Sequence, residues 1–111
     1  MLKTLLEPRK TVQYLMTPTD LSTLTLEHFS PLLEQEFGVV ETPYTFVLIS
    51  AQAAPSRANA PREAFSLLFR SPVPAQQGTY LLHHETLGQL EIFCVPVAQD
   101  GAGVQLEAVF S

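Results

Sequence analysis

The sequence predicts a mostly-β domain, an antiparallel sandwich or small barrel of about six strands with a short N-terminal helix. Two observations lead to that prediction. Apolar and polar residues alternate in successive short runs between residues 37 and 110, which is the two-residue period of a strand with one buried face. Turn-forming residues separate these runs, and no helical stretch between them is long enough to connect parallel strands.

Length and composition favour one folded domain. A chain of 111 residues fits a single core. Its hydrophobic content is 46 % and its net charge is only −5, which is typical of globular rather than disordered chains. The acidic balance argues against nucleic-acid binding, which requires basic side chains. A single cysteine excludes an internal disulfide framework, a cysteine-based zinc site and a redox pair.

We expect residues 1–23 to be an N-terminal extension and residues 24–111 to be the domain. The extension holds three of the six basic residues and has no sustained period, so it is ordered only where it docks. Its apolar start is interrupted at Glu7 and lacks the pattern of a secretory signal. No apolar run approaches the ~20 residues of a membrane span. These features predict a cytoplasmic protein with no membrane association.

The helix is predicted just after the extension. Thr25 is a candidate N-cap for one helical turn. Ser30 followed by Pro31 repeats the signal, with proline at the first helical position. The three- and four-residue spacing of Leu26, Phe29 and Leu33 predicts that these side chains share one face and cover the core.

Six strands follow from the alternation. They are expected at residues 37–41, 45–53, 65–70, 79–84, 89–97 and 104–110. Residues 85–88 and the pair Asp100-Gly101 are predicted hairpin turns. Pro96 predicts an edge or a bulge within its strand, because proline cannot donate to a ladder.

Strand 45–53 is apolar on both predicted faces. Val47, Ile49 and Ala51 alternate with Phe46 and Leu48. Such a strand is either covered on both sides or forms half of an interface. The second alternative makes a homodimer a candidate state.

Histidine and cysteine give no sign of catalysis. His83 and His84 are adjacent, so a regular strand points them to opposite faces and away from a shared metal ion. Cys94 shares a predicted face with Leu90 and Ile92, as a small buried hydrophobe does. The sequence contains no nucleophile, zinc-protease or phosphate-loop motif. We therefore expect no enzyme, no metal and no cofactor.

The arginines are the most informative charges. Arg57, Arg62 and Arg70 are the only basic residues after the extension, and arginine suits bidentate contact with carboxylates and carbonyls. One interpretation is a partner- or anion-binding loop. The favoured alternative is that Arg57 and Arg62 hold the loop at residues 55–61 onto the acidic domain. Only the structural alternative predicts a clear loss of thermal stability when these arginines are removed.

The segment Ser56-Arg57-Ala58-Asn59-Ala60-Pro61-Arg62-Glu63-Ala64-Phe65-Ser66-Leu67-Leu68-Phe69-Arg70 is distinctive. Together with Gln77 to Tyr80 and the terminal Glu107 to Phe110, it resembles a small bacterial family catalogued as a domain of unknown function. The resemblance covers about residues 24–111. It implies a small mostly-β protein encoded near tail-collar-like or tail-fibre-like phage proteins, and therefore an accessory or assembly role. It implies no catalytic residue.

Two functional hypotheses follow. The first is a non-enzymatic interaction or assembly-accessory protein that docks a sheet edge or surface loop onto a protein partner. The partner that the resemblance implies is a tail-collar-like protein. The second is a small-ligand or carbohydrate-binding module that uses Tyr44, Tyr80 and the arginine loop. The candidate binding residues are Arg57, Asn59, Arg62, Arg70 and Tyr80.

Overall fold

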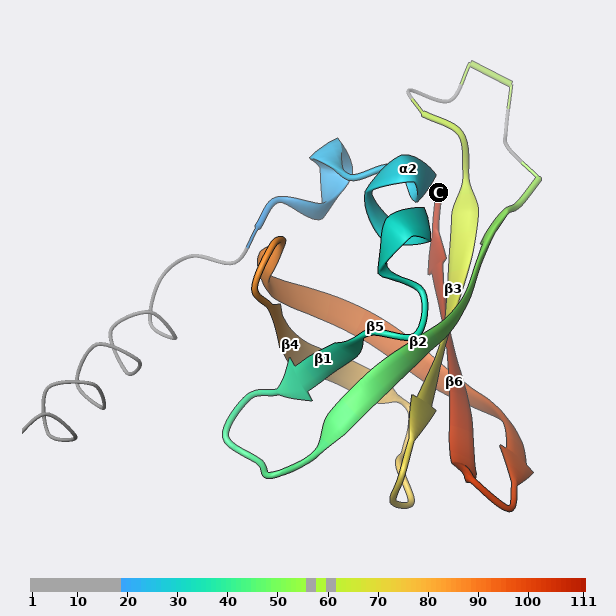
Figure 1. Cartoon of the computed structure of the whole chain (residues 1–111). Coiled ribbons are helices and arrows are strands. Elements are labelled where there is room, and N and C mark those ends of the chain that lie inside the picture. The colour runs from blue at the N-terminus through green and yellow to red at the C-terminus, as the bar shows by residue number, and fades with distance from the viewer. Residues whose placement is uncertain (1–18, 56–57, 60–61) are drawn as a thin grey trace, which may run out of the picture.

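The computed structural model describes residues 19–55, 58–59 and 62–111 (Figure 1). The elements of this part of the chain are η1 (Leu21–Thr23), α2 (Leu26–Phe29), η2 (Ser30–Leu32), β1 (Glu36–Val39), β2 (Thr45–Ala53), β3 (Phe65–Ser71), β4 (Gly78–His84), β5 (Gly88–Asp100) and β6 (Gly103–Phe110). All six predicted strands are present, and their bounds differ from the prediction by at most a few residues.

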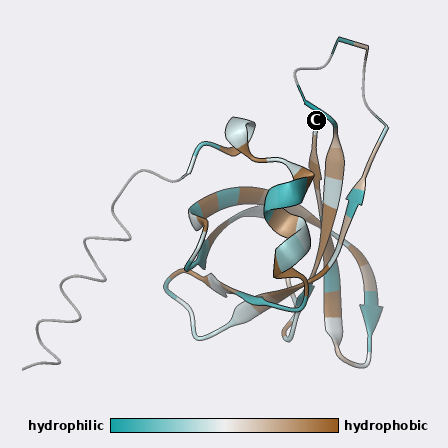
Figure 2. Cartoon of the chain, turned by 45° about the horizontal axis from the view of Figure 1, so that its top comes forward, coloured by the Kyte–Doolittle hydropathy of each residue, from teal (hydrophilic) through white to brown (hydrophobic). Residues whose placement is uncertain are grey.

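The six strands close into an antiparallel barrel with the neighbour order β1-β2-β3-β6-β5-β4 (Figure 2). The mostly-β prediction is confirmed, and of its two alternatives the structure takes the barrel. Hairpins join β1 to β2 to β3 and β4 to β5 to β6, and residues 72–77 connect the two halves. The seams between the halves are β3–β6 and the short β1–β4 pairing at Gly38 and Val39.

The barrel interior is filled by the inward residues of the alternating strands. On β3 these are Phe65, Leu67 and Phe69, and on β6 they are Leu106, Ala108 and Phe110, all buried. The predicted two-residue alternation of both strands is confirmed. Aromatic rings contact one another in the core. Phe65 stacks on Phe110 with ring centroids 4.7 Å apart, and Phe69 meets Phe37 edge-on at 5.3 Å.

Two register shifts bend the barrel wall. On β5 the pairing with β6 shifts between Pro96 and Ala98, so the predicted irregularity at Pro96 is a bulge. On β2 the shift lies between Leu48 and Ser50. Ala51 consequently pairs with inward-facing Leu67 and packs against the core with Leu48. The prediction that Ala51 faces away from Leu48 is therefore wrong, because the bulge at Ile49 resets the alternation.

The helical segment covers one end of the barrel. The Nδ1 atom of His28 accepts a hydrogen bond from the backbone N–H of Thr25, 2.9 Å away, which caps α2. Phe29 is fully buried, with its ring 5.8 Å from that of Phe65. Leu32 completes the cover, whereas Leu33 is 42 % exposed. The prediction for Leu33 is wrong because the helix tightens into η2 after Phe29, and this changes the spacing of its buried face.

Candidate interaction site

Strand β5 changes its partner along its length. Residues Gly88–Cys94 pair with β4, and residues Val95–Asp100 pair with β6. Residues Ala108–Phe110 at the end of β6 pair with β3. Within the described part of the chain, no ladder joins these two stretches, so β5 and β6 separate near the end of the barrel that α2 covers. Each therefore presents a short strand edge there.

A hollow of about 460 Å³ lies where the two strands separate. Phe93 and Val109 line it from the two separating strands, with exposed fractions of 52 % and 64 %. Its further lining residues include Leu21, Arg62 and Thr79. A large aromatic ring and an aliphatic side chain both exposed beside open strand edges are typical of an interaction surface.

Apolar side chains continue from this hollow over the outside of the barrel. Leu68 and Val95 are each paired with Glu107, and both are half-buried. Val97, at the β5 bulge, is 51 % exposed. Outward positions of a small barrel usually carry polar residues. We call the residues Leu68, Phe93, Val95, Val97 and Val109 the outer apolar surface.

Sequence reasoning did not single out Phe93 and Val109. The signal was present, because the assignment of Leu90, Ile92 and Cys94 to the inward face leaves Phe93 pointing outward. The same alternation, with Ala108 and Phe110 inward, leaves Val109 outward. An apolar residue at an outward position of an alternating strand is the pattern that identifies both.

Arg62 forms one wall of the hollow and holds the chain before α2 in place. Its guanidinium donates hydrogen bonds to the carbonyl oxygens of Leu21, at 2.6 Å, and Leu24. The same group lies over the rings of Phe65 and Phe110, 5.4 Å and 5.8 Å from their centroids, within cation–π range. Arg62 thus ties residues 21–24, at the junction of the predicted extension and domain, to the barrel.

The other residues of the predicted arginine loop are placed differently. Arg57 lies outside the described residues. Asn59 is exposed and has a φ of 65°, a left-handed conformation that asparagine tolerates better than most residues. Asn59 is not among the residues that line the hollow between β5 and β6.

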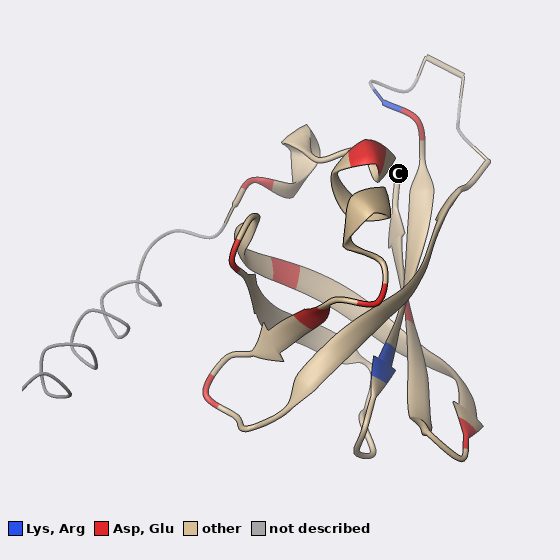
Figure 3. Ribbon diagram, viewed as in Figure 1, with Lys and Arg blue, Asp and Glu red and all other residues tan. Residues whose placement is uncertain are grey.

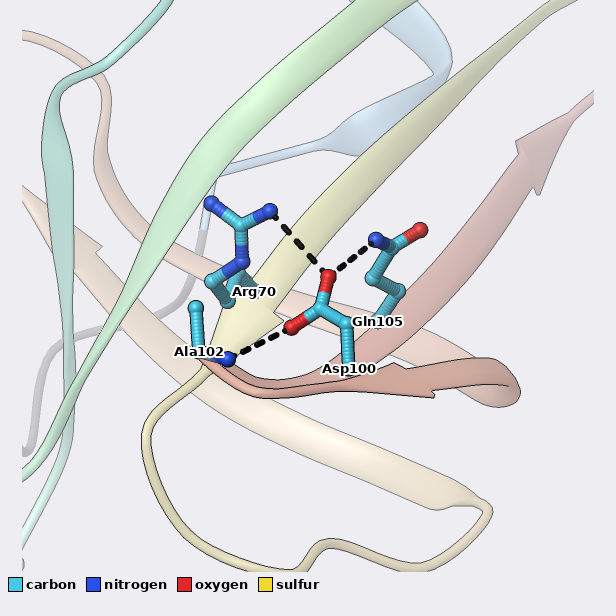
Figure 4. A network of polar contacts seen from close by, with 4 residues as sticks. All are labelled: Arg70, Asp100, Ala102 and Gln105. Atoms are coloured by element: carbon cyan, nitrogen blue, oxygen red, sulfur yellow. Dashed lines mark hydrogen bonds and ion pairs between the residues drawn. The ribbon is translucent and has the colours of Figure 1, made fainter.

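Arg70 lies at the opposite end of β3 from Arg62. Its Nη2 atom is 3.4 Å from Oδ2 of Asp100 (Figure 4). The Asp100 carboxylate also accepts hydrogen bonds from the Gln105 side chain and the Ala102 backbone, and these bonds lower the pKa of Asp100. Both members of the ion pair are more than one-third exposed, so solvent screens it and its contribution to stability is small.

Tyr80 belongs to a second hollow, of about 350 Å³, near the 72–77 connection. Its hydroxyl donates to the carbonyl oxygen of Gln76 and accepts from the Gln76 backbone N–H. Its ring meets Phe46 edge-on at 5.2 Å, and Tyr44 also lines the hollow. The structure therefore separates Arg62, Arg70 and Tyr80 into three places rather than one site.

Burial shifts the pKa values of the Cys94 thiol and the His84 imidazole. Burial raises the pKa of Cys94 to about 12, so its thiol is protonated at neutral pH. Burial also lowers the pKa of His84, which accepts from the Thr86 N–H through Nδ1. Among the described residues there is no group of three or more His, Cys, Asp or Glu side chains placed to hold a metal ion.

No helix in the described part of the chain is long and apolar enough to cross a membrane. Searches of curated proteins and of solved structures returned no match for this chain. A family model, described as "Domain of unknown function (DUF6916)", matches residues 24–110. The match covers the whole barrel and the helical segment at its end. The chain therefore belongs to the DUF6916 family, and the predicted membership of a family of unknown function is confirmed.

Proposed function

We propose that this chain is a non-enzymatic interaction module that docks onto a protein partner through the hollow between β5 and β6. The observation that carries the proposal is the exposure of Phe93 and Val109 on two strands that have separated. Exposed apolar side chains at a concave position recover the most free energy when a partner covers them.

Strand addition is the docking mode that fits this place. The stretch Leu90–Cys94 of β5 and the stretch Ala108–Phe110 of β6 each have a ladder on one side only within the described chain. The β5 edge before Leu90 is already occupied, because the carbonyl oxygen of Gln89 accepts a hydrogen bond from the Thr19 backbone N–H. An extended segment of a partner would pair with one of these edges, and its apolar side chains would contact Phe93 and Val109. Arg62 is held at the side of the hollow, where it would restrict the path of the added strand.

The first class of partner to test is a tail-collar-like or tail-fibre-like protein, which the sequence resemblance implies. The proposed compartment is the cytoplasm, and a single free thiol at Cys94 is compatible with its reducing conditions. Cell fractionation followed by detection of the natively expressed chain tests the compartment independently of any partner.

The test compares two double variants in affinity capture from cells that express the tail-like candidates. Phe93→Ser with Val109→Ser removes the apolar contacts of the hollow. Leu33→Ser with Tyr44→Ser is the matched control, because these residues are also exposed apolar positions but lie elsewhere. All four positions are exposed, so both variants should retain the fold, which thermal unfolding verifies.

The proposal expects a stoichiometric partner that the control retains and the Phe93/Val109 variant loses. Binding should also slow amide exchange at residues 90–94 or 108–110, as an added strand does. A partner retained equally by both variants would overturn this site. No partner for any bait, in cells shown to contain the tail-like proteins, would overturn the proposed function.

A second candidate function is small-ligand binding in the hollow beside Tyr44 and Tyr80. The observation in its favour is a mainly apolar concavity with two aromatic rings, of the kind that small ligands occupy. Arg62 lines the other hollow, so this candidate involves the tyrosines without that arginine. A ligand screen by chemical-shift perturbation, with Tyr44→Ala as the comparison, tests it; no shift near Tyr80 would eliminate it.

A further inference from the structure

A polar groove of about 550 Å³ runs over the outside of the seam between β1 and β4. Gly38 pairs with Thr45 on one side and His83 on the other. Because Gly38 has no side chain, the wall is hollowed between its two neighbours. Glu36 and Glu85 supply carboxylates to the groove.

The charge of the described part of the chain differs in sign from that of residues 1–18. The described residues carry ten Asp or Glu against only Arg62 and Arg70, a net of −8, and the acidic positions are spread along the ribbon of the barrel (Figure 3). Residues 1–18 carry Lys3, Arg9 and Lys10 against Glu7, a net of +2. Segments of opposite net charge attract one another.

Thr19, the first described residue, is bonded to the barrel. The Thr19 hydroxyl donates a hydrogen bond to the carbonyl oxygen of Leu87, at 2.7 Å, and its backbone N–H donates to that of Gln89, at 2.8 Å. Both acceptors belong to the β4–β5 hairpin, whose turn also contains Glu85. The basic segment is thus attached beside one of the two carboxylates that line the groove.

Gln89 adds an observation that is independent of charge. Leu90, Ile92 and Cys94 face the core, so Gln89 lies on the outward side of β5, where it is paired with His83. Its side chain is nevertheless only 6 % exposed, and neither atom of its amide has a hydrogen-bond partner among the described residues. A buried amide without hydrogen-bond partners is unfavourable, and an additional polar partner on this outer face would satisfy it.

We propose that residues 1–18 of this chain dock on the outer face of β4 and β1. Arg9 and Lys10 lie in the groove beside Glu36 and Glu85, and backbone groups just before Thr19 bond the Gln89 amide. The nine residue-to-residue steps from Lys10 to Thr19 can span up to about 30 Å, which is ample for a groove that begins at the same hairpin. This surface is separate from the outer apolar surface.

Amide hydrogen exchange on the full chain tests the proposal. Glu36→Lys with Glu85→Lys reverses the charge of the groove, and both side chains are exposed, so the fold is retained. The matched control, Glu27→Lys with Glu63→Lys, makes the same charge change at exposed positions outside the groove. A third variant combines the groove reversal with Arg9→Glu and Lys10→Glu, which restores opposite charges.

We expect exchange of the amides in residues 9–18 to accelerate at least about tenfold in the groove variant. The control should leave it within about twofold, and the four-substitution variant should restore the slow exchange. Gln89→Leu should also accelerate exchange just before Thr19, because it removes the proposed bonding partner while retaining side-chain bulk.

Three outcomes would overturn the proposal. In the first, exchange in residues 9–18 is fast in the parent chain and unaffected by the groove variant. In the second, the control accelerates exchange as much as the groove variant, which would make the attraction a general effect of net charge. In the third, protection falls on dilution, which would mean that the segment occupies the groove of a second copy.

Discussion

The Nε2 atom of His84 lies 2.7 Å from the Oε1 atom of Gln35, and this contact joins β4 to the residue just before β1. On the other side of the ring, Nδ1 accepts a hydrogen bond from the backbone N–H of Thr86, 3.1 Å away. The ring therefore carries its single proton on Nε2, which donates to Gln35. Phe37 packs against it, with ring centroids 4.8 Å apart. His84 is thus a structural, neutral histidine at the β1–β4 seam.

Stability is predicted to fall with acid through His84. Its pKa is lowered mainly by burial and further by His83, while Glu85 partly opposes the shift. A lowered pKa means that the unfolded chain binds the proton more readily than the folded chain. The contribution of His84 is therefore fully present above its unfolded pKa of about 6.5 and is lost as pH falls through its folded value. Urea unfolding at pH 7.5 and at pH 5 measures this loss.

His84→Gln is the comparison for that experiment. At pH 7.5 the free energy of unfolding of the variant should be lower by about 1–3 kcal/mol, because the Thr86 N–H and the Gln35 side chain lose their hydrogen-bond partner. Its stability should then change less between pH 7.5 and pH 5 than that of the parent chain. Equal pH dependence in the two proteins would show that His84 is not the group responsible.

Arg62→Ala is predicted to destabilise the protein by about 1–3 kcal/mol, since it removes hydrogen bonds from a charged donor to Leu21 and Leu24. It also removes a cation from the faces of Phe65 and Phe110. Thermal unfolding measures the loss. Arg62→Lys should recover only part of it, because a single ammonium cannot reproduce both the planar stacking and the forked donation.

Arg70→Ala is the natural control, because it deletes the other described arginine, at the opposite end of β3. Its ion pair with Asp100 is partly exposed and 3.4 Å long, so the expected loss is within about 1 kcal/mol. A loss at Arg70 equal to that at Arg62 would contradict the structural role assigned to Arg62.

Much of the barrel follows from the sequence because alternation is a local signal. The inward positions Phe65, Leu67 and Phe69 are determined by a two-residue period that their own strand displays. The same logic fails at Ala51, because the bulge at Ile49 depends on pairing with β3. It fails at Leu33 as well, because the chain tightens into η2 before that residue and then bonds β2, where the Glu34 N–H donates to the Leu48 carbonyl oxygen.

The candidate interaction site could be predicted only in part. Outward Phe93 and Val109 can be found by alternation, but the separation of β5 from β6 depends on where β5 changes partner, which no local pattern records. The partners of Arg62 are also remote in sequence: Leu21 lies 41 positions before it and Leu24 lies 38 positions before it. Charge spacing could identify the arginine but could not place it against Leu21 and Leu24.

Cys94 is predicted to resist thiol reagents in the folded protein. Its side chain is fully buried, and burial raises its pKa to about 12, so both access and thiolate are lacking. Labelling with a disulfide reagent at pH 8 should be slow in buffer and fast in denaturant. Rapid labelling of the folded chain, in the absence of global unfolding by circular dichroism, would contradict the buried position.

Gly103 is predicted to be the least replaceable glycine of the β5–β6 hairpin. Its φ is 138°, and a Cβ atom placed there would lie 2.0 Å from the carbonyl oxygen of Ser71, a backbone atom that cannot rotate away. Gly103→Ala must therefore displace β6 from the end of β3 and should cost at least about 2 kcal/mol. Gly101→Ala, in the same turn, meets no atom within 4 Å and should cost much less. Chemical denaturation of both variants measures the difference; comparable losses would mean that the turn, rather than the close approach to Ser71, requires glycine.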